Sequence, residues 1–433
     1  IRLSAGSMGN GNVSPYSYTS EMTVSTADDI VLGGSYPSYT SVGSTVPVSL
    51  TWEKSTTYDV GLDLDFFNNR LSVSGDYYRR YTTDMYTASV ALPAVYGTGS
   101  PKGNNAEMKT DGWELSLSWR DSFKLGGKPF DYSIKAMVWD SKSVITKYVN
   151  DTGSLGTVKG FIENGGSPSS YYVGMTVGEI WGYTVAGLFR DQADIDSSAI
   201  HDFVQASDKV TRPGQVKIAD LDGNGFIDPG NFAVDDHGDL RIIGNQSPRY
   251  RYGVNLSARW NGIGLSVFLQ GVGARDWYPG SDAGMFWGKY GRPFFALIPS
   301  IHNYTDDMYS AERNNWDTAY WPRMTTYQSN GTKNWTRLLE IPNTRYIQSA
   351  AYLRVKNIQL DYSFPKHICS AIRLQGLKIY VNAENLFTFT PLHKYAPNFD
   401  PEGLSYDSDF ASAADGYTYP ILKSVTVGVN ITF

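Results

Sequence analysis

The stretch TYDVGLDLDFFNNRLSVSGDYYRRY, residues 57–81, holds two amphipathic segments joined by a tight turn. From Tyr58 to Phe66 the even-numbered residues are apolar and the odd-numbered ones are Asp or Gly. This period of two predicts a β-strand with one apolar and one polar face. Asn68 and Asn69 tolerate the positive φ of a hairpin turn, and Leu71 resumes the alternation. Segments of about ten residues suit strands that cross a bilayer, but a long hairpin of a soluble sandwich would alternate in the same way.

The composition of the chain bounds the class of protein. Of 433 residues 14% are aromatic, with 31 Tyr and 11 Trp, and membrane barrels place such residues in girdles at both interfaces. No segment approaches the roughly 18 consecutive apolar residues of a transmembrane helix, so a membrane protein with this sequence would have to be a closed barrel. The net charge of −6, without any run of Lys or Arg, gives no sign of nucleic-acid binding. Cys369 is the only cysteine, so no internal disulfide can form.

The alternating pattern recurs along the chain. Hairpins are predicted around Gly126-Gly127 and Asn261-Gly262, and a change in apolar parity predicts a bulge near Lys356 and Asn357. Further strands are predicted at residues 1–8, 351–364, 377–389 and 421–433, and irregular stretches at 9–48, 83–108, 141–247, which includes two short strands near 180–189, and 273–348. Short turns and long loops thus alternate, as they do in outer-membrane barrels. We predict an all-β, antiparallel transmembrane barrel, with about 10–12 strands in this chain, short periplasmic turns and long extracellular loops.

Several motifs, spread over nearly the full chain and in order, resemble the SusC/RagA family of TonB-dependent outer-membrane transporters. They are LTWEKSTTYDVGLD (50–63), FFNNRL (66–71), RPGQV (212–216), DLDGNGFID (220–228), IGNQSP (243–248), YLRVKNI (352–358), NAENLF (382–387) and the terminal strand 425–433. No single motif would be specific, but the ordered set is.

The resemblance implies that residues 1–433 are the C-terminal portion of such a barrel. Members of the family carry an N-terminal module, a TonB box, a plug domain and a barrel of about 22 strands, and the motifs here resemble only the later part of that barrel. The sequence begins at Ile1 without an initiator Met or a secretory signal, so we expect a mature product or a fragment. The N-terminal barrel and plug segment would then be supplied separately, for example by a second chain of a nicked transporter. A complete small barrel is the alternative, because an even number of strands can close.

The resemblance also implies a function. Such a protein lies in the outer membrane of a Gram-negative bacterium, contacts the lipid bilayer and imports oligosaccharides or oligopeptides. It carries a SusD-like surface lipoprotein as a lid and is energised by TonB through the N-terminal part that is missing here. Two alternatives come from other classes: an outer-membrane adhesin or enzyme barrel without TonB coupling, and a soluble sugar-binding sandwich.

One acidic loop has the spacing of a cation site. Asp220, Asp222, Asn224 and Asp228, with Gly225, fit positions 1, 3, 5, 9 and 6 of a calcium loop, in which oxygen ligands at alternate positions surround a hard cation. Position 12 is Asn231 where a bidentate Glu belongs, and no amphipathic helices flank the loop. The alternatives are therefore a Ca²⁺ or Mg²⁺ site in an extracellular loop, or a loop held by Asx turns.

The stretch 277–335 is unusually aromatic, and four of its tryptophans are candidate contacts. Flat rings stack on sugars and act as hot spots in protein interfaces, so Trp277, Trp287, Trp316 and Trp321 are predicted to contact the lid or the ligand. Packing within the loops is the alternative. Catalysis finds no support, because the five His are scattered and neither a His-Glu-x-x-His motif nor a Gly-x-Ser-x-Gly elbow is present.

Overall fold

A computed structural model of the chain describes residues 1–11, 19, 22–43, 46, 50–89, 95, 101–157, 168, 170–200, 211–279, 286, 307–323, 342–404 and 421–433. Ten strands form one antiparallel sheet in the order β1-β4-β5-β6-β7-β12-β13-β16-β17-β18. Their bounds are β1 Arg2–Asn10, β4 Glu53–Phe66, β5 Leu71–Ala88, β6 Lys102–Leu125, β7 Lys128–Lys147, β12 Arg249–Trp260, β13 Ile263–Ala274, β16 Tyr352–Ser363, β17 Gly376–Phe389 and β18 Ser424–Thr432.

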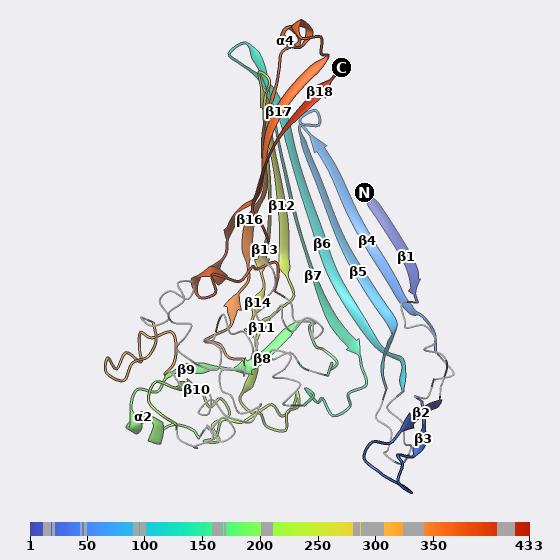
Figure 1. Cartoon of the computed structure of the whole chain (residues 1–433), viewed down its shortest axis with the longest axis vertical. Coiled ribbons are helices and arrows are strands. Elements are labelled where there is room, and N and C mark those ends of the chain that lie inside the picture. The colour runs from blue at the N-terminus through green and yellow to red at the C-terminus, as the bar shows by residue number, and fades with distance from the viewer. Residues whose placement is uncertain are drawn as a thin grey trace.

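The sheet rises as a tall, twisted wall with short turns at one end and the longer connections gathered at the other (Figure 1). We call these the turn end and the loop end. The turn end holds the tight turns that the sequence predicts, and positive φ angles at Asn68 (55°), Asn69 (63°) and Asn261 (48°) show why Asn occupies them. The fourth connection at this end contains the short helix α4, Lys366–Ala371. No described helix is long and apolar enough to cross a membrane.

The sheet is open among the described residues. Strands β1 and β18 lie at opposite ends of the strand order, β1 pairs only with β4, and β18 pairs only with β17 in the described part of the chain. The ten strands agree with the predicted number, but they do not form the closed small barrel that was considered as an alternative.

One face of the sheet is apolar from edge to edge. The cross-strand pairs Leu64–Val73, Val73–Leu117 and Leu117–Ala136 lie on it. From Ile134, on the same face of β7, successive pairs continue through Leu256, Val267, Ile358, Ala383 and Val425. The opposite, polar face carries residues such as Arg2, Asp63, Asp76, Arg120, Ser133, Ser257, Asp361 and Lys378. Because the side-chain period of a strand is two, this continuity confirms the alternation read from residues 57–81.

Two local predictions can be compared directly with the structure. Against β13 the register shifts between Phe268 and Leu269, which pair with Asn357 and Val355, so Lys356 is the extra residue and the predicted bulge is confirmed. The prediction of a loop over 83–108 was wrong at both ends, because β5 continues to Ala88 and β6 begins at Lys102. The pairing survives there through register shifts around Asp84, whose carbonyl accepts a hydrogen bond from Asn104.

The loop end has a core of its own, to which the sheet contributes Ile145 of β7. Strands β8 (Glu179–Tyr183) and β9 (Val185–Leu188) confirm the two short strands predicted near 180–189, and they pair with β11 (Leu240–Asn245) and β10 (Val216–Ile218). Two-residue strands β14 (Asp276–Trp277) and β15 (Gln348–Ser349), helix α2 (Gln192–Asp196) and the 3-10 helix η5 (Pro391–Lys394) complete the layer. Hairpin β2–β3 (Met22–Thr26 and Ser38–Val42) stands beside it.

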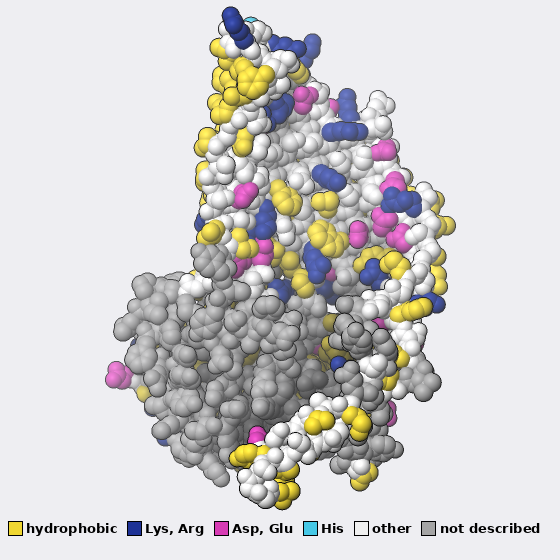
Figure 2. All heavy atoms as spheres, turned by 45° about the vertical axis from the view of Figure 1, so that its right-hand side comes forward, with side chains coloured by type: hydrophobic (Ala, Val, Ile, Leu, Met, Phe, Trp, Pro, Cys, Tyr) yellow, Lys and Arg dark blue, Asp and Glu magenta, His cyan; other side chains and the backbone are white. Residues whose placement is uncertain are grey.

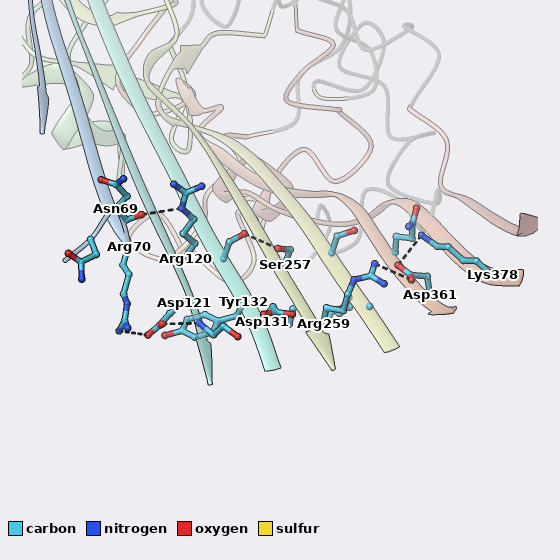
Figure 3. A pocket seen from close by; sticks show the side chains of 18 residues that line it. Asn69, Arg70, Arg120, Asp121, Asp131, Tyr132, Ser257, Arg259, Asp361 and Lys378 are labelled. Carbon is cyan, nitrogen blue, oxygen red and sulfur yellow. Dashed lines mark hydrogen bonds and ion pairs between the residues drawn. The ribbon is translucent and has the colours of Figure 1, made fainter. Parts of the chain in front are cut away.

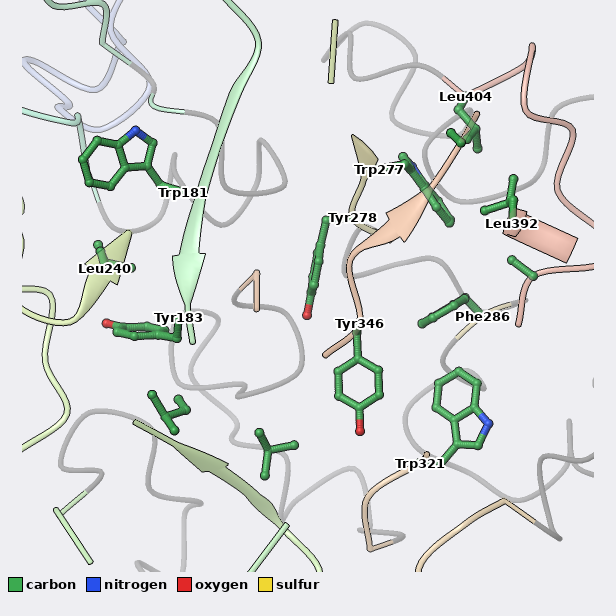
Figure 4. Close-up of a cluster of buried hydrophobic side chains, with 14 of the residues drawn as sticks. Trp181, Tyr183, Leu240, Trp277, Tyr278, Phe286, Trp321, Tyr346, Leu392 and Leu404 are labelled. Atoms are coloured by element: carbon green, nitrogen blue, oxygen red, sulfur yellow. The ribbon is translucent and has the colours of Figure 1, made fainter. Parts of the chain in front are cut away.

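Aromatic side chains fill this loop core. Trp277, Tyr278, Phe286, Trp321 and Tyr346 lie close to one another in Figure 4, and each is almost fully buried. The described parts of the long connections therefore form one packed layer across the loop end.

Candidate functional site

The polar face is hollowed near the turn end. A hollow of about 980 Å³ is lined by side chains from β6, β7, β12, β13, β16 and β17, together with residues 68–70 of the β4–β5 turn. Figure 3 shows Arg259 and Lys378 converging on Asp361, at N–O distances of 3.5 and 3.3 Å. On the other side of the hollow, Arg70 lies 3.4 Å from Asp121. The hollow is thus a wet, charged surface rather than an apolar binding slot.

Pairs of opposite charge continue along the polar face toward β1. Arg2 contacts Asp63 at 2.5 Å and Asp76 at 2.7 Å, and Ser133 and Ser257 share a hydrogen bond of 2.8 Å between strands. Figure 2 shows dark blue and magenta side chains interspersed over the upper part of the sheet. Such a face can line an aqueous passage for polar solutes, because it offers donors and acceptors of both signs without one dominant charge.

A buried arginine ties the loop layer to the sheet. Arg354 of β16 is 3% exposed, and its guanidinium reaches Asp400 at 2.6 Å, Glu402 at 3.1 Å and the Thr388 hydroxyl at 2.9 Å. Neighbouring Lys356 also contacts Glu402, at 2.7 Å. We call these five residues the Arg354 clamp. It fixes the segment after β17, which contains η5, against the loop end of the sheet.

The four predicted tryptophan contacts fall into three situations. Trp277 and Trp321 are 0% and 3% exposed and lie within the loop core, so their burial favours the packing alternative over direct contact with a lid or ligand. Trp316 is only partly buried and packs on the edge of that core. Trp287 lies outside the described residues. Of the predicted set, only Trp316 is a described side chain with surface left for a partner.

The structure exposes apolar surface elsewhere, in a place that the sequence reading treated as plain loop. The β2–β3 hairpin ends in a tight Gly33-Gly34 turn, with reciprocal backbone hydrogen bonds between Leu32 and Ser35. Its exposed apolar residues are Met22, Val24, Ile30, Val31, Leu32, Tyr36 and Tyr39, each at least half exposed. The alternation of apolar and polar residues is too short there to predict strands. The apolar run Ile30-Val31-Leu32 directly before Gly33-Gly34 is the sequence feature that could have predicted an exposed apolar turn.

The predicted acidic loop is arranged partly as a cation site requires. Carboxylate oxygens of Asp220, Asp222 and Asp239 lie within 4.8 Å of one another. Asp239 was not predicted, and it sits beneath the loop, fully buried, accepting hydrogen bonds from Leu221 N (2.6 Å) and Asp228 N (3.1 Å). Burial raises the pKa of Asp239, and the carboxylates of Asp222 and Asp220 add to that rise.

The same loop also holds itself together. Gly223 N and Gly225 N donate to Asp220 at 2.6 and 2.9 Å, while the Asn224 amide donates to Asp222 and Asp228. Burial opposes ionisation of Asp220, but these backbone donors outweigh it and lower its pKa. Asp228 points an oxygen at Gly230 N, so it does not join the three converging carboxylates. The Asx-turn alternative therefore has direct support, and cation binding stays a prediction.

Calcium titration separates these two alternatives. If the loop binds Ca²⁺, calcium at about a hundred times its Kd stabilises the folded protein by about 2.7 kcal/mol. Asp239→Asn is expected to abolish that gain, because it removes the buried charge, while Asp235→Asn on the exposed side should retain it. Thermal unfolding with and without millimolar calcium measures the effect, and an unchanged midpoint contradicts the prediction.

Comparisons with known proteins agree with this architecture. A family model described as TonB dependent receptor-like, beta-barrel matches residues 10–202. TonB-dependent receptor P3 of Formosa agariphila is 26% identical over 440 residues, covering 100% of this chain and 39% of the relative. TonB-dependent receptor SusC of Bacteroides thetaiotaomicron is 24% identical, covering 89% of this chain and 32% of that protein. The structure of the RagAB peptide importer in the 'closed-closed' state superposes with a TM-score of 0.66 at 20% identity, over 100% of this chain and 40% of that one.

Fold and matches together make the chain similar to the β-barrel of TonB-dependent receptors. Within that class it is similar to receptors of the SusC/RagA type, which confirms the resemblance carried by its motifs. The named relatives are receptors rather than enzymes, in agreement with the prediction that this chain has no catalytic role. The chain spans about two fifths of the length of the curated relatives it matches first.

Proposed function

We propose that residues 1–433 form the C-terminal portion of the barrel wall of an outer-membrane active nutrient importer in a Gram-negative bacterium. The apolar face meets lipid, the polar face lines the lumen, the turn end faces the periplasm and the loop end faces outside. The observation that carries this proposal is the continuous apolar face across ten antiparallel strands of 9 to 24 residues, closed at one end by short turns.

The cargo that we propose is an oligosaccharide or an oligopeptide. The lumenal face has charges of both signs and many hydroxyl and amide groups, which suit a large polar solute better than a lipid or a metal chelate. RagAB, a structural neighbour, is named a peptide importer, and the SusC-like relatives carry no substrate in their names. Peptide and glycan are therefore both retained as substrate classes.

Energy coupling and gating are assigned to partners of this chain. In this proposal the N-terminal barrel and plug segment completes the barrel, TonB acts on that segment, and a SusD-like lipoprotein covers the loop end. The chain itself supplies wall, lumen surface and mouth. Among the described residues β1 and β18 each have one edge without a partner strand. This suits the arrangement, because a strand edge in lipid is stable only when another strand pairs with it.

Uptake measured in whole cells tests the proposed function. Cells that express the complete receptor should accumulate a labelled oligopeptide or oligosaccharide mixture, and a protonophore should abolish the accumulation while leaving surface binding intact. Uptake that persists without proton-motive force would favour a barrel without TonB coupling. Surface attachment without any uptake would favour the adhesin alternative.

The exposed β2–β3 hairpin is the lid contact that we propose in place of the buried tryptophans. Substituting Val31 and Leu32 together by Glu is expected to weaken co-purification of the SusD-like lipoprotein at least tenfold, because both side chains are more than half exposed and offer apolar contact area. Ser38→Glu is the matched control, since it adds charge to the same hairpin at an exposed polar position. Equal recovery of the lipoprotein by the Val31/Leu32 variant would exclude the hairpin as its contact.

A further inference from the structure

The turn end of the sheet has a charge that the rest of the chain does not share. Four connections form it, residues 67–70, 126–127, 261–262 and 364–375, and they contain no Asp or Glu. Every residue in them that is charged at pH 7 is basic: Arg70, Lys366 and Arg373. Lys124 and Lys128, in the strand ends on either side of the Gly126-Gly127 turn, add two more cations. By contrast, the chain as a whole has a net charge of −6. Figure 2 shows dark blue side chains gathered at this end.

Hydrogen bonds join three of these connections into one continuous rim. Trp260 donates its indole N–H to Leu125 O at 3.0 Å, and Lys128 donates to Asn261, which links the β6–β7 turn to the β12–β13 turn. Ser363 N donates to Gly262 O at 2.8 Å, which adds the connection that contains α4. The cations beside the β6–β7 turn and those of the α4 connection therefore sit on a fixed surface rather than on independent loops.

The α4 segment is both anchored and exposed. Phe364 N donates to Leu377 O and Gln375 N donates to Thr432 O, so both of its ends are tied to the sheet. Between these ends Lys366 and Arg373 are exposed and make no salt bridge with the described part of the chain. Ile368 and Ile372, four residues apart and so on one side of the helix, are 39% and 53% exposed. A small apolar surface thus lies beside free cations.

Arg373 occupies a backbone position at which Gly is the usual residue. Helix α4 ends with Leu374 N donating to Cys369 O and Arg373 N donating to Ser370 O, and Arg373 has a φ of +60°. A non-Gly residue in this left-handed conformation costs roughly 1 kcal/mol relative to Gly. Arg373 thus places a cation at a position where the backbone alone would favour Gly.

Aromatic residues mark where this rim meets the bilayer. Phe67 is 67% exposed and Phe123 is 50% exposed, and the rings of Phe123, Phe130 and Tyr132 contact one another on the apolar face just before the basic turns. Aromatic rings of this kind lie at the level of lipid headgroups. Cations immediately beyond them are therefore placed at headgroup phosphates.

We infer that the turn end, and α4 above all, binds anionic phospholipid headgroups of the periplasmic leaflet. The inference rests on the proposed function, because it requires the barrel to sit in a membrane with this end facing the periplasm. Lys366 and Arg373 would contact the phosphates, and Ile368 and Ile372 would enter the acyl boundary, in the manner of a short interfacial helix. The unpaired state of both cations favours a partner that is purely anionic, such as phosphatidylglycerol.

Native mass spectrometry of the complete receptor tests this inference. The receptor, prepared in detergent and shown to migrate as a heat-modifiable barrel, is titrated with phosphatidylglycerol or with zwitterionic phosphatidylcholine. The parent is expected to prefer phosphatidylglycerol, and the Lys366→Gln/Arg373→Gly variant is expected to lose that preference by about fivefold per cation removed. Glycine suits the positive φ at position 373, so this variant should unfold at no lower temperature than the parent. Arg190→Gln, which removes one cation from the loop layer, is the control and should retain the preference.

Each outcome bears on the inference. Equal binding of the two lipids by the parent, or an undiminished preference in the double variant, would overturn it while leaving the importer proposal intact. Loss of binding to peptidoglycan, or a plug made protease-sensitive, with the lipid preference unchanged, would assign the rim to those partners and also overturn it. A receptor that never migrates as a folded barrel would refute the proposed function itself, and the lipid inference with it.

Discussion

Replacing Trp277 with alanine is expected to open the loop layer, with a loss of about 3–5 kcal/mol in the free energy of local unfolding. Trp277 is fully buried, and its ring centroid lies 4.9 Å from that of Phe399 and 6.2 Å from that of Phe286, so alanine would leave a cavity among packed rings. Native-state proteolysis of the assembled receptor measures the effect, because cleavage tracks the population of the open form. At about 1.4 kcal/mol for each factor of ten, the loss corresponds to an increase in cleavage at the loop end of about a hundredfold to several thousandfold.

Two further variants show whether packing is the cause. Trp277→Phe should cost much less, because it retains the ring and removes an indole N–H that has no hydrogen-bond partner among the described residues. Trp316→Ala, at a partly exposed position, should alter cleavage only slightly. If Trp277→Ala left proteolysis unchanged but weakened recovery of the lipoprotein, the original prediction of direct contact would stand and the packing interpretation would be wrong.

These aromatic residues show where sequence reasoning reached its limit. The density of Trp, Tyr and Phe in residues 277–335 predicted either contacts with a partner or packing within the loops, but it did not show which rings are buried. Aromatic side chains favour burial and interfaces alike. Only the meeting of segments far apart in sequence, such as Trp277, Trp321 and Phe399, determines which of the two applies.

The sheet was far more accessible to prediction. Period-two alternation, Asn-Gly and Gly-Gly turns and the parity change at Lys356 each depend on neighbouring residues alone, so strands, turns and bulge could be read locally. The extra length of β5 and β6 could not be read, because a polar stretch such as 102–110 becomes a strand only when a partner strand satisfies its backbone. Asp239 was missed for a similar reason: it is eleven residues beyond Asp228 and reaches the acidic loop only through the fold.

Replacing Arg354 with methionine is expected to release the segment after β17, at a cost of about 3–5 kcal/mol. Methionine matches much of the volume of the side chain, but it leaves Asp400 and Glu402 close together and without their main counter-charge. The backbone around them is also held by Arg275, which donates to Pro401 O at 3.2 Å and Leu404 O at 2.6 Å, so release should be local rather than global. Cleavage by trypsin after Lys394, followed by mass spectrometry, reports it.

The charge balance, rather than the arginine as such, should determine the size of this effect. Adding Asp400→Asn and Glu402→Gln to Arg354→Met removes the unpaired carboxylates, and most of the lost protection against trypsin should return. Lys356→Met removes the more exposed contact of Glu402 and should cost under about 1 kcal/mol, because Arg354 still pairs with that carboxylate. A triple variant as sensitive to trypsin as Arg354→Met would show that the guanidinium acts through its packing against Tyr352 and its bond to Thr388 instead of through charge.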